Sequence, residues 1–148
     1  SEVIKSEENA VMLFLGRGDA LDGVREYARK KGVSEHIEFM GSRTDISRFY
    51  QAMDLFLFPS FHEGLPIAGV EAQTADLPCL FSDAITREIM ITDRAVSMPL
   101  DSGAAKWAKK SISLAKTYGR RNVSDKITAA GYDAADMGKR MGRIYEQQ

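Results

Sequence analysis

The chain has 148 residues, of which 44% are hydrophobic and 28% charged, as in a single ordinary globular domain. Its formal net charge is −1 and its lysines and arginines are scattered, so the composition gives no sign of a nucleic-acid partner. No apolar run has the length that a bilayer-spanning helix needs, and the single cysteine, Cys79, cannot form an internal disulfide. We therefore expect a protein of the reducing cytoplasm.

Apolar runs and helix patterns alternate along the first hundred residues. The apolar runs predict strands at residues 11–15, 36–41, 54–59, 78–82 and 95–100. Helix patterns between them predict helices at residues 19–31, 46–53, 66–75 and 86–90. Strands and helices at this spacing favour right-handed βαβ units, so we predict an α/β fold with one Rossmann-like, doubly wound parallel sheet. The first run, VMLFL, is apolar throughout, as expected for a strand buried on both faces.

Residues suited to helix N-caps precede several of the predicted helices. Asp19 is suited to cap the first helix, and Thr44 or Asp45 is suited to cap the second. After the last strand the pattern becomes helical, with a helix that Ser102 could cap. Further helices are predicted at residues 120–130 and 133–146. The fold prediction therefore includes a helical C-terminal end.

The loops after the strands are the candidate sites, because ligands bind beyond the carboxyl ends of an open parallel sheet. The loop GRGD, residues 16–19, resembles the start of a dinucleotide fingerprint, and Glu38 could serve as its ribose-binding acid. Leu21 stands where that fingerprint has its third glycine. A tight turn is the simpler interpretation of the glycines, but an NAD-binding oxidoreductase domain stays as an alternative.

The stretch PSFHEGLPIAGVEAQ, residues 59–73, combines a loop with the start of a helix. Pro66 suits the first turn, because the N–H that it lacks would be unpaired there anyway. The backbone N–H groups of Ile67, Ala68 and Gly69 would then point out of the helix start and, with the helix dipole, form a site for a phosphate or diphosphate.

Two glutamates flank this predicted anion site at positions eight apart. Glu63 lies in the loop before the helix, and Glu71 lies more than one turn inside it. A carboxylate at the flank of a phosphate site is badly placed to meet the phosphate but well placed to accept hydrogen bonds from a neighbouring diol, such as a ribose. The spacing can therefore grip three parts of one ligand: a sugar, a phosphate and a ribose.

The segment FPSFHEGLPIAGVEAQTADLPCLFSD resembles the E-x-x-x-x-x-x-x-E signature of retaining glycosyltransferases with the GT-B architecture, the group-1 (family 4) class. The preceding IEFMGSRTDISRFYQAMDLFLFPS is similar to the same family's sequence before that motif. The resemblance covers essentially the whole chain and is closest to bacterial enzymes of capsular and exopolysaccharide synthesis. It implies that the chain is most of the carboxyl-terminal, donor-binding half of a two-domain enzyme.

The resemblance also implies roles for individual residues. Glu63 would hold hydroxyls of the donor sugar, as the catalytic carboxylate, and Glu71 would bind the ribose of the nucleotide. The remaining donor contacts would come from loop and helix-start residues: Gly64, Leu65, Ile67, Ala68, Arg43 and Thr44. The family transfers a sugar from a nucleotide donor, most commonly a UDP-sugar in this setting, with retention at the anomeric carbon and without a bound metal ion or other cofactor.

Three other residues lie on strand-end loops where they could contact the donor or a phosphate: His62, Arg17 and Arg87. The acceptor implied by the resemblance is a growing surface polysaccharide or a lipid-linked sugar, which would bring the protein to the inner face of the cell membrane. A non-catalytic nucleotide- or protein-binding module is a further alternative to an enzyme.

The chain also departs from the family pattern. Asp76 stands where the family usually has glycine, although Asp tolerates a left-handed backbone, and Gly69 lies inside a helix where a bulkier residue is common. The chain begins with SEVIKSEENA, which is typical of a helix end and a loop. With this beginning, the resemblance implies that residues 1–148 are one domain that lacks its first strand, the family's basic pair that neutralises the diphosphate, and the amino-terminal acceptor domain. Such a fragment alone is expected to be inactive.

Overall fold

The computed structural model describes residues 1–117 and 119–146. Within these ranges the strands are β1 (Met12–Leu15), β2 (Ile37–Gly41), β3 (Phe56–Phe58), β4 (Cys79–Ser82) and β5 (Ala95–Met98). The α-helices are α1 (Leu21–Lys30), α2 (Ile46–Ala52), α3 (Ile67–Thr74), α4 (Ala104–Ala115), α5 (Ser124–Ala129) and α6 (Ala134–Glu146). Single turns of 3₁₀-helix form η1 (Val3–Lys5), η2 (Ser34–His36), η3 (Arg87–Ile89) and η4 (Leu100–Ser102).

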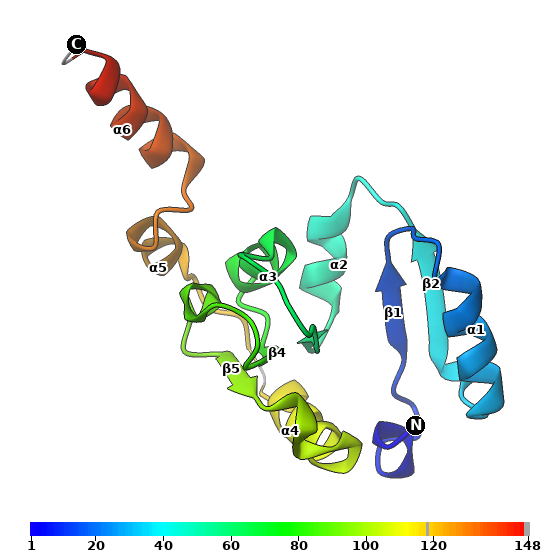
Figure 1. Ribbon diagram of the computed structural model, residues 1–148. Helices are drawn as coiled ribbons and strands as arrows, with labels where there is room; N and C mark the ends of the chain where they lie inside the picture. Colours follow the sequence, from blue (N-terminus) through cyan, green and yellow to red (C-terminus); the bar gives the residue numbers. More distant parts are fainter. Residues whose placement is uncertain (118, 147–148) are drawn as a thin grey trace.

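All of these strands pair in parallel, which confirms the predicted α/β fold. Hydrogen bonding divides them into two ladders: β1 pairs with β2, and β4 lies between β3 and β5. The expected single sheet is therefore interrupted, because no ladder in the described residues joins β1 to β3. Figure 1 shows β1, β2 and α1 standing beside the α2–α3 part of the molecule, while α6 extends away from both ladders.

Strand β1 is not buried on both faces, so that expectation is wrong. Val11 is 56% exposed, and Met12 and Phe14 are each 41% exposed. Phe14 stacks on Phe39 of β2 with ring centroids 5.4 Å apart. The apolar run forms the predicted strand but stays half-exposed, because β1 has a hydrogen-bonded neighbour along one edge only.

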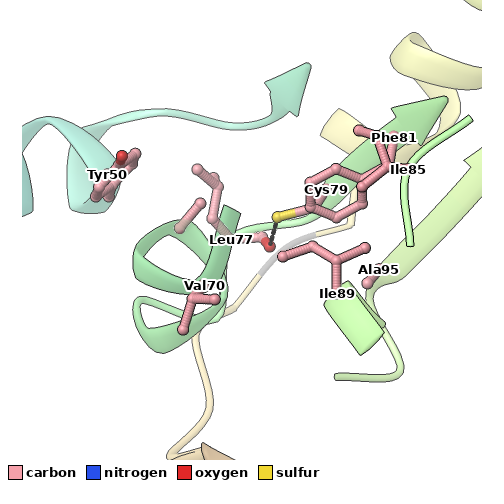
Figure 2. Packing of buried hydrophobic residues seen from close by; sticks show 9 residues of the cluster. Tyr50, Val70, Leu77, Cys79, Phe81, Ile85, Ile89 and Ala95 are labelled. Atoms are coloured by element: carbon pink, nitrogen blue, oxygen red, sulfur yellow. Dashed lines mark hydrogen bonds between the residues drawn. The ribbon is translucent and has the colours of Figure 1, made fainter. Parts of the chain in front are cut away.

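The principal core surrounds β4. Leu77, Cys79, Leu80 and Phe81 are fully buried, and Figure 2 shows Cys79 and Phe81 among side chains from α2, α3, η3 and β5. Burial raises the pKa of the Cys79 thiol, which donates to the carbonyl of Leu77 over 3.1 Å. Cys79 is therefore a small buried side chain of the core, as a lone cysteine at such a position commonly is.

Helix α3 packs closely on this core at Gly69. A Cβ atom added there would lie 2.8 Å from Cε1 of Phe81 and 3.1 Å from Cδ1 of Ile89. The residue that the sequence marked only as a cost in helix propensity is thus the point at which α3 and β4 come together. A larger side chain would push the helix away from the sheet.

Three predicted N-caps differ from the structure. Helix α1 is preceded by Ala20 rather than capped by Asp19, and α4 follows Gly103 rather than Ser102. Asp45 occupies the N-cap position of α2, but its side chain does not cap the helix. Its carboxylate instead pairs with the guanidinium of Arg43 at 2.9 Å, because the charged donor outcompetes the neutral backbone amides.

Asp76, at the end of α3, has the left-handed backbone that the sequence analysis allowed for, with φ of 50°. Its side chain is fully buried, and Arg121 donates to it from the backbone N–H at 2.7 Å and from the guanidinium at 3.1 Å. Burial alone would raise the pKa of Asp76, but the hydrogen bonds from Arg121 outweigh it and hold the pKa below its ordinary value. This contact fastens the segment before α5 to the β4 side of the domain.

Candidate functional site

Glu71 lies in the second turn of α3, on the same exposed face as Ile67 one turn earlier. The hydroxyl of Tyr50 from α2 donates a hydrogen bond to its Oε2 atom over 3.2 Å. Burial, with the neighbouring Glu71 charge, raises the pKa of Tyr50 to about 12, so the phenol remains a donor at neutral pH. One carboxylate oxygen of Glu71 is thereby held, and the carboxylate stays exposed at the surface.

The sequence analysis did not single out Tyr50 as a site residue. It belongs to the apolar face of the helix at 46–53, and its ring meets Phe56 edge-on at 6.0 Å. Such a position is typical of a core residue, and Tyr50 does belong to the core cluster. The signal that it does more is the hydroxyl, because a buried phenol needs a polar partner.

Glu63 lies in the loop between β3 and α3 and is exposed. Ser60 donates to its Oε1 atom over 3.4 Å and to the carbonyl of His62 over 3.2 Å. The backbone of Glu63 forms a parallel β-bridge with Ile85, and Ser82 of β4 donates to the carbonyl of Ser60. The loop that carries Glu63 is therefore held at the carboxyl end of β4.

The start of α3 differs in detail from the prediction. Pro66 is the N-cap residue, just outside the helix rather than in its first turn. The N–H of Gly69 is already used, because it donates to the carbonyl of Pro66 over 2.9 Å. The N–H groups of Ile67 and Ala68 have no backbone acceptor among the described residues. The predicted anion site is therefore reduced to these two donors, which lie between Glu63 and Glu71 in sequence.

The remaining predicted donor contacts lie on loops and at the helix start. Gly64 and Thr44 are exposed, whereas Leu65 is partly buried against the core. Arg43 is paired with Asp45, and its guanidinium lies 5.3 Å from the ring centroid of Phe49. This arrangement presents a flat cationic surface next to Thr44, at the loop after β2.

The three other candidates are all exposed but lie in separate places. His62 is in the Glu63 loop, and Arg87 begins η3 after β4. Arg17 lies after β1, on the ladder that is not joined to β3. In that loop Gly16 has φ of 126° and donates to the carbonyl of Gly41, so the glycine serves the turn between neighbouring strand ends.

Gln73 is a polar residue at the base of the site that the sequence analysis missed. It is fully buried in α3, and its amide nitrogen donates to the carbonyl of Ile89 over 2.7 Å. Its amide oxygen accepts from the N–H groups of Ile91 and Thr92 at 3.1 and 3.0 Å. One side chain thus pins the segment after η3 to α3.

Among residues 1–117 and 119–146, no three histidine, cysteine, aspartate or glutamate side chains gather in a way that could hold a metal ion. In the same residues, every helix is too short or too polar to cross a membrane.

The sequence model of the family "Glycosyl transferases group 1" matches residues 1–117 of this chain. A putative glycosyltransferase, EpsF of Bacillus subtilis, is 30% identical over 131 residues, which are 83% of this chain and 33% of that protein. A UDP-Gal:alpha-D-GlcNAc-diphosphoundecaprenol alpha-1,3-galactosyltransferase of Escherichia coli is 32% identical over 76 residues, 51% of this chain and 20% of that enzyme. The chain therefore spans a third or less of the length of these relatives.

Two solved structures share the fold. WaaG, a glycosyltransferase involved in lipopolysaccharide biosynthesis, superposes with a TM-score of 0.65 at 21% identity, over 85% of this chain and 33% of WaaG. HepE of Anabaena in complex with UDP superposes with a TM-score of 0.67 at 17% identity, over 94% of this chain and 41% of HepE. The described α/β arrangement thus matches part of the fold of these two larger chains.

Proposed function

This chain belongs to the group 1 glycosyl transferases, and on that premise we propose that it is the donor-binding domain of a retaining hexosyltransferase. The observation that carries the proposal is the pair of exposed glutamates on either side of the start of α3, each with an oxygen held by a neighbouring hydroxyl. Glu71 binds the two hydroxyls of a ribose, and Tyr50 orients it for that contact. Glu63 binds hydroxyls of the donor sugar.

Between the two glutamates, the diphosphate is received at the start of α3. The N–H groups of Ile67 and Ala68 donate to it, and the backbone at Gly64 and Leu65 borders the sugar. Arg43 and Thr44, at the loop after β2, border the base. The UDP bound to HepE and the UDP-galactose in the name of the Escherichia coli relative support a uridine nucleotide as the donor of this chain.

The interruption between β1 and β3 supports the proposal that the intact domain has one more strand. The doubly wound order places the first strand of such a domain in the middle of its sheet, between the second and the fourth. If the strands described here are the second to the sixth, the first would pair with β1 and β3 and would cover Phe14. On this proposal residues 1–148 alone bind nucleotide weakly and are inactive, because a further strand and an acceptor domain would have to complete the site.

The acceptor that we propose is a growing surface polysaccharide or a lipid-linked sugar. The support is the chemistry in the relatives' names, which include a sugar diphosphoundecaprenol acceptor and lipopolysaccharide biosynthesis. The reaction would take place in the cytoplasm, at the inner face of the cell membrane, and would need no metal ion.

The test is a titration of the protein with UDP, GDP, ADP and NAD, followed by amide NMR shifts. UDP should shift the amides at 41–45 and 63–72, and Glu71→Ala should weaken its affinity about tenfold through the loss of charge-assisted hydrogen bonds. The matched control is Glu38→Ala, which removes the ribose-binding acid of the alternative dinucleotide site. Shifts at 16–20 with NAD alone, lost in Glu38→Ala, would replace the proposal by that alternative.

A further inference from the structure

A small pocket lies at the carboxyl ends of β4 and β5, outside the donor site described above. Its cavity volume is about 180 Å³, and its polar lining comes from Ser82, Asp83, Thr86, Arg87 and Ser97. Pockets for drug-sized ligands usually measure about 300–1,000 Å³, so this one suits a single small polar ring rather than a whole nucleotide. The carboxyl ends of parallel strands are also where such sheets bind their ligands.

The pocket adjoins the loop that carries Glu63. Ile85 lines the pocket and forms the β-bridge with Glu63, and Ser82, another lining residue, donates to the carbonyl of Ser60 in the same loop. Glu71, by contrast, accepts its hydrogen bond from Tyr50 of α2, which does not line the pocket. A ligand that runs from Glu71 across the start of α3 to Glu63 would therefore meet this pocket at its sugar end.

Four of the five polar side chains of the pocket are uncommitted. Within the described part of the chain, the side chains of Asp83, Thr86, Arg87 and Ser97 make no hydrogen bond or ion pair, and Asp83 and Arg87 do not pair with each other. A carboxylate supplies acceptors and a guanidinium supplies donors. Sugar hydroxyls both donate and accept, so a ring that carries several of them can use both charges and both hydroxyls at once.

Gln73 holds the segment at residues 89–92, which begins with pocket-lining residues, against α3. This fully buried amide bonds to the carbonyl of Ile89 and to the N–H groups of Ile91 and Thr92, directly after the residues that line the pocket. The other end of the pocket lining, at Ile85, is fixed by its bridge to Glu63. Preorganisation of this kind lowers the entropy that a ligand must lose on binding.

We propose that this pocket is a subsite for a single sugar ring beside Glu63, with Asp83 and Arg87 as its hydroxyl-binding residues. The ring is either the hexose of the nucleotide-sugar or the acceptor ring next to it. This inference rests on the proposed donor-binding function, because it takes Glu63 as the sugar end of the ligand.

The experiment measures affinities by calorimetry on the full-length protein and on the variants Asp83→Asn and Arg87→Gln. The probes are UDP, UDP-glucose, UDP-galactose, and methyl α-glucoside and methyl α-galactoside in the presence of saturating UDP. Glu88→Gln is the matched control, because Glu88 is exposed in the same turn but does not line the pocket. Thermal melting of each variant checks folding, which should not change, since the substituted side chains make no hydrogen bond or ion pair among the described residues.

Each outcome decides the proposal. Affinity for a UDP-hexose that falls five- to tenfold in both pocket variants, with UDP affinity unchanged, supports a subsite for the donor hexose. Loss of methyl hexoside binding in the variants, with UDP-hexose affinity unchanged, supports a subsite for the acceptor ring. Variants that match the wild-type chain with all the probes overturn the subsite but leave the donor site standing. Failure of the donor site itself is distinguishable, because Glu71→Ala would then leave the affinity for UDP unchanged.

Discussion

The two ladders of this molecule differ in how deeply their strands are buried. The β3–β4–β5 ladder has α3 and η3 packed against it, and Leu77, Leu80 and Phe81 are fully buried there. Every residue of β1 and β2 is at least partly exposed, and Phe14 is 41% exposed. Both ladders come from apolar runs of similar length. Strand β4, which pairs along both edges and has α3 and η3 packed against it, is buried more deeply than β1, although both come from apolar runs.

The candidate site follows this contrast. Glu63, Glu71 and the pocket beside Glu63 all belong to the β3–β4–β5 ladder and the helix packed on it. Only the predicted base contacts, Arg43 and Thr44, come from the loop after β2 on the other ladder. The parts of the site that need fixed geometry are therefore built on the part of the molecule with its own core.

The largest effect is expected from Gln73, whose amide joins α3 to the end of η3. Gln73→Leu keeps the volume but leaves the N–H groups of Ile91 and Thr92 and the carbonyl of Ile89 unpaired. The free energy of unfolding should fall by about 3 kcal/mol or more. Denaturant unfolding measures the change, and Gln51→Leu, at an exposed position of α2, is the matched control with little effect. A loss below about 1 kcal/mol would contradict the role given to Gln73.

A glycine-to-alanine pair compares the two ladders directly. Gly69→Ala should destabilise the protein by about 2 kcal/mol, because the new Cβ would lie 2.8 Å from Cε1 of Phe81. Gly23→Ala, in the first turn of α1, meets nothing within 4 Å and should stabilise the protein by up to about 1 kcal/mol through helix propensity. Thermal melting of both variants measures the opposite signs. Equal signs would mean that α3 is packed no more tightly than α1.

Asp76 allows the stability of the β3–β4–β5 side of the molecule to be tested through its dependence on pH. Its pKa is lowered in the folded protein, so its contribution to stability is present above its ordinary pKa and is lost as pH falls through the folded value. Asp76→Asn keeps a residue that tolerates the left-handed backbone but removes the charge, and should cost about 1–2 kcal/mol at pH 7. The difference between wild type and variant should shrink toward pH 2 in urea unfolding curves. A difference that is independent of pH would contradict the ion pair with Arg121.

The smallest effect on stability is expected from Tyr50→Phe, which removes one hydroxyl and should cost about 0.5–1 kcal/mol at neutral pH. The raised pKa gives this position a pH signature. The stabilisation is present below the ordinary tyrosine pKa of about 10 and is lost as pH rises through about 12, because only the unfolded chain ionises in between.

The Tyr50→Phe variant should lack that alkaline loss, and its affinity for UDP should fall a few-fold because Glu71 loses its orienting donor. Stability from pH 8 to 12 and calorimetry with UDP measure the two effects. Ile46→Val, on the same helix and packed against the same core, controls for changes in packing. An alkaline loss that persists in Tyr50→Phe would assign the titration to another group.

The order of the elements could be predicted from the sequence, because apolar runs and turn residues carry that information locally. The strand positions, the helix after Pro66 and the left-handed backbone at Asp76 follow from such signals. The spacing of Glu63 and Glu71 around a helix start could likewise be read from the residues between them.

Other features depended on partners that are distant in sequence. Asp45 was expected to cap a helix but pairs with Arg43, and β1 was expected to be buried on both faces but pairs only with β2 among the described residues. Gln73 has the residue type of a surface position, and only the fold shows what its amide reaches 16 to 19 positions away. From the sequence, Gly69 could be recognised only as unfavourable for a helix. The structure shows why glycine stands there, because the ring of Phe81 leaves no room for a Cβ atom.

Arg120 lies on the segment that follows α4, far along the chain from both glutamates. Its guanidinium donates to the carbonyl of Tyr50 at 3.1 Å, to that of Met53 at the end of α2, and to that of Ala75 at 2.8 Å at the end of α3. One side chain therefore couples the helix that carries Tyr50 to the helix that carries Glu71. If the proposed donor site is correct, a selection for variants with altered donor preference should therefore enrich substitutions at Arg120. This residue is not one of the proposed ligand contacts.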